Sequence, residues 1–185
     1  MSYTPRLNDN GILNNFHWYS DNPFYIAGYG MPNCTCYAWG RFWEIGDPNS
    51  IGEHKPTQLP TGDGGVWWDR AVQSGYYQTG QIPKLGSVIC FYDANGGAGH
   101  VAIVEEINMQ TGQITCSNSA WQSTYFFLTN ITPVNGKYNW SHYVFQGFIY
   151  NPYADQPVPP STPLKKKKFP WVIYANKIRK RNLTK

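Results

Sequence analysis

The 185-residue chain has few charged residues and no long apolar run. No stretch approaches the roughly 20 consecutive apolar residues that a membrane-spanning helix needs. The first nine residues contain no basic segment followed by an apolar one, which is the pattern of a secretory signal peptide. We therefore expect synthesis in a cytoplasm without a cleaved leader, and another route of delivery if the protein acts outside the cell.

Cysteine and histidine are also scarce, with four of each. Cys34 and Cys36 are too close to bridge comfortably, and Cys90 and Cys116 lie in apolar, strand-like runs, so we expect four reduced thiols. The Cys-x-Cys pair lacks zinc-finger spacing, and no His-Glu-x-x-His occurs. The glycine-rich turn at residues 96–99 lacks the Gly-Lys-Ser/Thr of a phosphate loop. The sequence thus predicts no metal site and no cofactor.

Aromatic residues, by contrast, make up 17% of the chain, against 14% charged residues. This balance suits a compact domain with an aromatic-lined groove and excludes a disordered chain. Nine of the 15 Lys and Arg residues lie in residues 164–185, which contain no acid. Residues 1–163 therefore contain six Lys and Arg residues and all 11 Asp and Glu residues. The body therefore carries a net charge of about −5 and the tail +9.

The order of apolar periodicities predicts one α+β domain over residues 1–151. Helical spacing covers residues 34–44 and 65–74, and short apolar or β-branched runs follow at 87–92, 101–107, 113–117, 124–129 and 143–150. Helices before a meander of strands indicate N-terminal helices packed on an antiparallel β-sheet. Five prolines predict an extended linker over residues 152–163, and residues 164–185 form a basic aromatic tail.

Cys34 is the candidate nucleophile, because it begins the first predicted helix just after Gly30, Met31 and Pro32 have ended the preceding segment. A helix N-terminus exposes unpaired N–H groups and a partial positive charge, which favour thiolate over thiol. The alternative is a small buried hydrophobic residue, the commoner state of a cysteine.

His100 is the candidate general base. It follows a glycine-rich turn and opens an apolar strand, so its side chain is expected at the rim of the sheet. Asn118 ends the next predicted strand, where it could accept a hydrogen bond from one ring nitrogen and leave the other facing the thiol. The ordinary alternatives are a structural or solvated histidine and a strand-end turn former.

Four blocks of sequence in a fixed order carry a resemblance to a known family. They are Asn33-Cys34-Thr35-x-Tyr37-Ala38-x-Gly40-Arg41, then Gly62-Asp63-Gly64 leading to Trp67-Trp68 and Ala71, then Pro83-Lys84-Leu85-Gly86-Ser87-Val88, then Gly99-His100-Val101-Ala102-Ile103-Val104-Glu105. Together they resemble the CHAP domain, the cysteine- and histidine-dependent amidohydrolase/peptidase, over about residues 25–150. The resemblance implies a papain-like α+β fold and cleavage of peptidoglycan, as in phage lysins and bacterial wall hydrolases.

By position, the resemblance implies that Cys34 is the nucleophile and His100 the base. Many members have Glu at the place of Asn118 and Asn two residues on, where this chain has Ala120, so the orienting residue is expected to be Asn118 alone. Some members carry a calcium loop of aspartates ahead of the cysteine. Asp21 is the one acid between residues 10 and 33, so no such site is predicted.

The implied mechanism is acyl transfer to water. Cys34 attacks an amide carbonyl, backbone N–H groups at the helix start together with Asn33 hold the oxyanion, and His100 protonates the leaving amine. Water then hydrolyses the thioester. Candidate groove walls are the tryptophans Trp67, Trp68 and Trp121, each of which could equally be core packing.

The predicted function is hydrolysis of a peptidoglycan amide bond by a phage endolysin or virion-associated lysin, as an N-acetylmuramoyl-L-alanine amidase or an endopeptidase. It would act on the cell wall after holin-type release or as part of a virion. Two alternatives stay open: a non-catalytic virion or wall-binding component with the same fold, and an acyltransferase that uses the same triad. The basic tail could bind an anionic wall polymer, a membrane surface or a virion protein, or be solvated; nucleic-acid binding has no fold signature.

Overall fold

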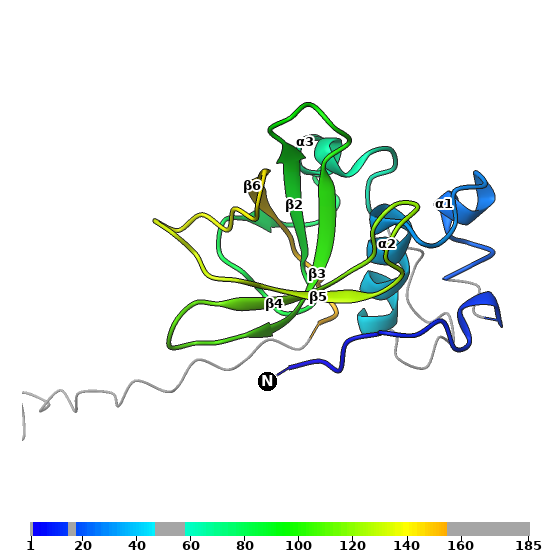
Figure 1. Cartoon of the computed structure of the whole chain (residues 1–185), viewed down its shortest axis with the longest axis horizontal. Helices are drawn as coiled ribbons and strands as arrows, with labels where there is room; N and C mark the ends of the chain where they lie inside the picture. The colour runs from blue at the N-terminus through cyan, green and yellow to red at the C-terminus, as the bar shows by residue number, and fades with distance from the viewer. Residues whose placement is uncertain (1, 15–17, 47–57, 155–185) are drawn as a thin grey trace, which may run out of the picture.

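The computed structural model describes residues 2–14, 18–46 and 58–154 (Figure 1). The helical elements come first: η1 (Ile12–Asn14), α1 (Pro23–Ile26), α2 (Cys34–Gly46), η2 (Gly64–Val66) and α3 (Trp67–Ser74). The strands follow: β1 (Thr79–Gly80), β2 (Val88–Asp93), β3 (His100–Ile107), β4 (Ile114–Asn118), β5 (Phe127–Ile131) and β6 (Tyr143–Ile149). This order confirms the predicted α+β class. None of the helices in the described part of the chain is long and apolar enough to cross a membrane.

The six strands form one sheet in the order β1-β6-β2-β3-β4-β5, with every neighbouring pair antiparallel. The segment β2–β5 is the expected meander. β6 instead returns to pair with β2 and β1, and so places the last strand inside the sheet. The strand expected at 124–129 is observed at Phe127–Ile131, and α1 and β1 are too short to leave a periodic signal.

The sheet is buried on both faces, because alternate residues of β2 and β3 enter two different apolar clusters. Val88, Cys90, Val101 and Ile103 pack beneath the helices, and α2 lies against β3. The residues between them face a second cluster that includes Tyr138, Phe145 and Phe148. Burial on both sides holds β3, and with it His100, in a fixed position relative to α2.

A close approach of two glycine-containing loops fixes the turn ahead of β3. Gly99 has φ +73°, and a Cβ built on it would lie 2.4 Å from the backbone of Gly65. A Cβ on Gly64 would meet the backbone of His100 at 3.0 Å, and the Gly65 N–H donates to the Ala98 carbonyl at 2.8 Å. The loop before α3 therefore packs directly on the turn that presents His100.

The predicted linker and tail fall on residues that are mostly outside the described part. Of residues 152–185, the structure describes 152–154.

Candidate active site

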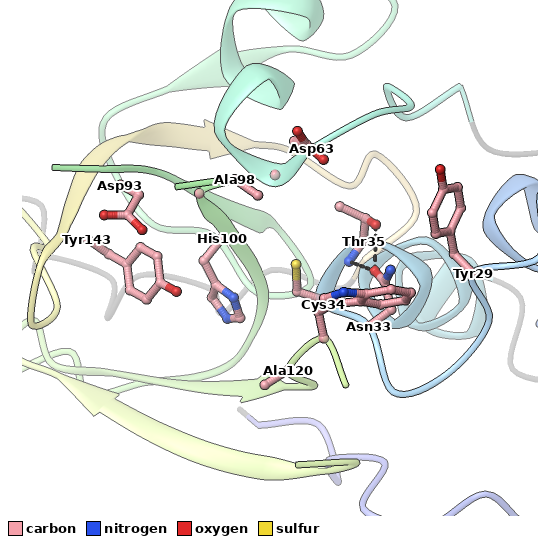
Figure 2. Close-up of a pocket in the computed structure, with 13 residues that line it drawn as sticks. Tyr29, Asn33, Cys34, Thr35, Asp63, Asp93, Ala98, His100, Ala120 and Tyr143 are labelled. Carbon is pink, nitrogen blue, oxygen red and sulfur yellow. Dashed lines mark hydrogen bonds between the residues drawn. The ribbon is translucent and has the colours of Figure 1, made fainter. Parts of the chain in front are cut away.

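A cavity of about 400 Å³ opens where the start of α2 meets the beginning of β3 and the end of β2 (Figure 2). Cys34 and His100 both line it, together with Asn33 and Trp121. The fold thus brings together residues that lie far apart in the sequence and were singled out for different reasons. Asn118 stands directly behind His100.

Asn33 caps helix α2 and so positions Cys34. Its Oδ1 accepts hydrogen bonds from the N–H of Thr35 at 2.8 Å and of Cys36 at 3.0 Å, and from the Thr35 hydroxyl at 2.6 Å. Its own N–H donates to Ser119 Oγ at 3.0 Å, which ties the helix start to the end of β4. With Oδ1 occupied by the cap, the Nδ2 end has no partner among the described residues, and Asn33 as a residue belongs to the lining of the cavity.

Asn118 fixes the tautomer of His100. The Asn118 Nδ2 donates to the carbonyl of Cys116 and to Thr129 Oγ1, both at 3.0 Å, and a carbonyl can only accept. The other end of the amide, Oδ1, must therefore face His100 Nε2, 2.9 Å away. Nε2 carries the proton, and Nδ1 keeps a lone pair for accepting one.

Aromatic rings enclose His100, which is only 5% exposed. The ring centroids of Tyr143 and Trp140 lie 5.3 and 5.5 Å from that of the imidazole, and Phe91 lies at 6.4 Å. Burial lowers the pKa of His100 to about 4, although the Asn118 hydrogen bond acts in the opposite direction. The imidazole is therefore neutral at pH 7 and available as a base.

Burial also raises the pKa of the Cys34 thiol, to about 11. Backbone N–H groups of Val101, Thr35 and Cys34 itself lower the pKa, but by less than burial raises it. The helix start therefore acts on the thiol in the expected direction, but burial outweighs it and keeps the pKa of Cys34 above its ordinary value. The site holds a neutral thiol beside a neutral base. Cys34 is also the most accessible of the four cysteines, all of which are free and the other three fully buried.

The three candidate tryptophans occupy different places. Trp121 is 47% exposed, lines the cavity, and meets Tyr29 edge-on with ring centroids 5.7 Å apart. Trp67 is fully buried and stacks on Phe24 in the core, so it cannot serve as a groove wall. Trp68 packs over Gly147 of β6, where a Cβ would meet its ring at 2.1 Å, and it does not line the cavity. The alternative of core packing applies to Trp67 and Trp68.

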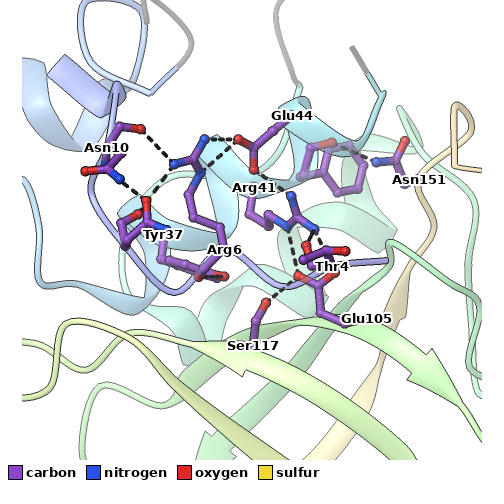
Figure 3. Close-up of polar contacts among 11 residues, drawn as sticks. Thr4, Arg6, Asn10, Tyr37, Arg41, Glu44, Glu105, Ser117 and Asn151 are labelled. Atoms are coloured by element: carbon purple, nitrogen blue, oxygen red, sulfur yellow. Dashed lines mark hydrogen bonds and ion pairs between the residues drawn. The ribbon is translucent and has the colours of Figure 1, made fainter. Parts of the chain in front are cut away.

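A buried ion pair fastens the nucleophile's helix to the strand of the base (Figure 3). Arg41 Nε and Nη2 donate to the two carboxylate oxygens of Glu105 at 2.8 and 2.9 Å, with Glu105 1% exposed. Ser117 Oγ donates to Glu105 at 2.6 Å, and Arg41 also reaches Glu44 at 2.6 Å. The pair joins α2, β3 and β4, the three elements that carry Cys34, His100 and Asn118.

Sequence reasoning missed four cavity residues: Tyr29, Asp63, Asp93 and Tyr143. Each lies in a loop or at a strand end, where residue type alone does not distinguish a lining residue from a solvated one. Asp63 belongs to the second block of the family resemblance, and this is the one feature of the sequence that could have pointed to any of the four as a site residue. No group of three or more His, Cys, Asp or Glu side chains within the described residues could hold a metal ion.

Comparison with known proteins agrees with this arrangement. The family model described as the CHAP domain matches residues 24–120, just over half of the chain. Over 121 residues the chain is 31% identical to a protein described as a probable autolysin LDP from Staphylococcus aureus (strain NCTC 8325 / PS 47). The alignment covers 62% of this chain and 37% of that protein, so the chain spans little more than a third of the relative's length.

Proposed function

The chain belongs to the CHAP-domain family, and from this membership we propose that it is a peptidoglycan hydrolase that cleaves an amide bond with Cys34, His100 and Asn118. The observation that carries the proposal is the hydrogen bond from His100 to Asn118 beside an accessible thiol in one cavity. This arrangement supports three roles: Cys34 as the nucleophile, His100 as a base with a defined tautomer, and Asn118 as the residue that orients the base.

The first step follows from the two neutral partners. Substrate binding places an amide carbonyl over Cys34, and His100 Nδ1 takes the thiol proton as Sγ attacks the carbonyl carbon. The backbone N–H of Cys34 and the Nδ2 of Asn33 are placed to donate to the oxyanion. The capping bonds to Asn33 Oδ1 support this role, because they leave the Nδ2 end of the amide free to donate.

The second half of the reaction returns the proton. His100, now an imidazolium held by Asn118, protonates the leaving nitrogen, and the amine departs with formation of a thioester. Water, deprotonated by the neutral imidazole, then attacks the thioester and releases a carboxylate and the free thiol. The aromatic enclosure of His100 limits competing solvent contact with its ring.

The test is digestion of purified walls by the protein and three variants. Cys34→Ala should abolish the release of new amino groups, and His100→Ala should reduce the release by at least about 10²-fold. Cys36→Ala is the matched control, since that thiol is buried and turned into the core. Circular dichroism and thermal unfolding establish that each variant is folded.

Three outcomes decide between the candidate functions. Lysis by folded Cys34→Ala would refute the assignment of the nucleophile. Wall binding that survives iodoacetamide, with no digestion by the unmodified protein, would identify a non-catalytic binding component. A requirement for added amine would identify an acyltransferase.

The biological setting that we propose is a phage enzyme, either an endolysin or a virion-associated lysin. The aligned relative is described as a probable autolysin of Staphylococcus aureus, so a bacterial setting is the alternative to the phage one. Two observations separate the phage roles. Immunodetection of the protein in purified virions would indicate a virion-associated lysin. Lysis that occurs only after release from infected cells would indicate an endolysin. Deletion of residues 164–185 tests whether the basic tail contributes wall or membrane affinity.

A further inference from the structure

The cavity around Cys34 is acidic. Two carboxylates, Asp63 and Asp93, belong to its lining, and none of the lining residues is Lys or Arg. His100 adds no positive charge while its imidazole is neutral. The local field therefore favours a substrate segment that carries an ammonium group and disfavours one that carries a carboxylate.

The positions of the oxyanion donors and of His100 indicate which half of the substrate lies near Asp93. The start of α2, with the Cys34 N–H and the side chain of Asn33, a residue only 8% exposed, lines the cavity on the side of Cys34 away from His100 and offers the donors for the carbonyl oxygen. The leaving nitrogen must then lie toward His100, which protonates it. The amine half continues beyond the imidazole, on the side away from Cys34.

Asp93 and Tyr143 lie on that far side of His100 (Figure 2). The pairing of the strands agrees, because Phe91 is opposite His100 and Asp93, two residues further along β2, is opposite Tyr143. The carboxylate and the phenol ring together therefore border the path of the amine half. The ring provides a surface for a short alkyl chain, and the carboxylate provides a charge at the end of that path.

The carboxylate of Asp93 retains the capacity to bind a ligand. Oδ1 accepts one hydrogen bond from the Asn95 N–H at 2.7 Å, which fixes the side chain. The imidazole of His142 lies 3.6 Å from Oδ2, beyond hydrogen-bond distance, and is 42% exposed. Each carboxylate oxygen has two lone pairs, so acceptor sites remain for an ammonium group.

We infer that the enzyme selects an amide bond whose nitrogen belongs to a diamino acid, and that Asp93 binds the second amino group of that residue. The inference rests on the proposed function and deepens it. In a peptidoglycan stem such a bond is an endopeptidase target. The muramoyl-alanine amide differs, because its amine half begins with alanine and then a glutamate.

The test compares two synthetic γ-linked D-isoglutaminyl-L-lysyl peptides, in which the α-carboxyl of the D-glutamyl residue is amidated, that differ only in acetylation of the lysine side-chain amine. Acetylation should lower kcat/KM about tenfold in the unmodified protein, as expected for the loss of one charge-assisted hydrogen bond. In Asp93→Asn the two peptides should be cleaved within about twofold of each other. Asparagine retains the oxygen that accepts the Asn95 N–H, so the turn is preserved. Asp69→Asn, an exposed acid on α3, is the matched control and should keep the tenfold preference.

Whole walls separate failure of this inference from failure of the proposed function. Mass spectrometry of Cys34-dependent fragments should find a diamino acid at the new amino terminus. New termini of any other kind, equal cleavage of the two peptides, or a preference that survives in Asp93→Asn would overturn the inference while leaving the hydrolase intact. Absence of any Cys34-dependent digestion would overturn both.

Discussion

Acidification should destabilise the protein through His100 well before the carboxylates titrate. The imidazole has a pKa of about 4 in the folded protein and 6.5 as the reference value. The unfolded chain therefore binds a proton between pH 6.5 and 4 that the folded chain rejects, and the free energy of unfolding falls as the pH falls through this window. The stability is fully present above pH 6.5.

The size of the effect follows from the difference between the two pKa values. Between pH 7 and pH 5 the loss is about 2 kcal/mol, and by pH 4 it approaches about 3 kcal/mol. The side chain is 5% exposed, so solvent screening is small. Glu44 contributes in a lower window, because its salt bridges with Arg6 and Arg41 hold its pKa below the ordinary value despite burial.

Urea unfolding at pH 7, 6 and 5 measures the effect, with His100→Gln as the test variant. Glutamine cannot titrate, so the variant should lose about 2 kcal/mol less than the unmodified protein between pH 7 and 5, whatever its stability at pH 7. Equal losses in the unmodified protein and His100→Gln would refute the assignment of a buried neutral imidazole. Over the same range kcat/KM should stay level, because the base remains unprotonated down to about pH 4.

Three further predictions concern the thiol, the ion pair and the turn. Alkylation of Cys34 by iodoacetamide should accelerate steadily as the pH rises toward about 11; a rate that is constant from pH 5 to 9 would indicate a preformed ion pair with His100. Glu105→Gln should lower the free energy of unfolding by about 3 kcal/mol, because it leaves the guanidinium groups of Arg6 and Arg41 with Glu44 as their one shared carboxylate, and a loss below about 1 kcal/mol in urea would contradict this. Gly99→Ala should destabilise the protein by at least about 2 kcal/mol, because residue 99 has a positive φ and its new Cβ would meet the loop before α3; unchanged thermal unfolding would show that the two loops can separate.

Local chemistry explains why Cys34, His100 and Asn118 could be selected from the sequence. A cysteine after a proline at a helix start, a histidine after a glycine-rich turn and an asparagine at a strand end each occupy a position defined by local signals. The ordered blocks that contain Cys34 and His100 also indicated the family, which the match over residues 24–120 confirms. Helices α2 and α3 and most of the strands followed from periodicity, because amphipathic spacing repeats within a few residues, whereas α1 is too short to show it.

Tertiary structure alone decided the features that depend on contacts between distant segments. The position of β6 beside β2 is one, since an apolar strand does not specify its neighbour. The different places of Trp67 and Trp121 are another, because both are large aromatic residues and only packing buries one and exposes the other. The raised pKa of Cys34 is the third: the helix start was visible in the sequence, but the burial that outweighs it comes from the packing of α2 against β3. The acidic side of the cavity likewise exists only once the ends of β2 and β6 lie beside His100.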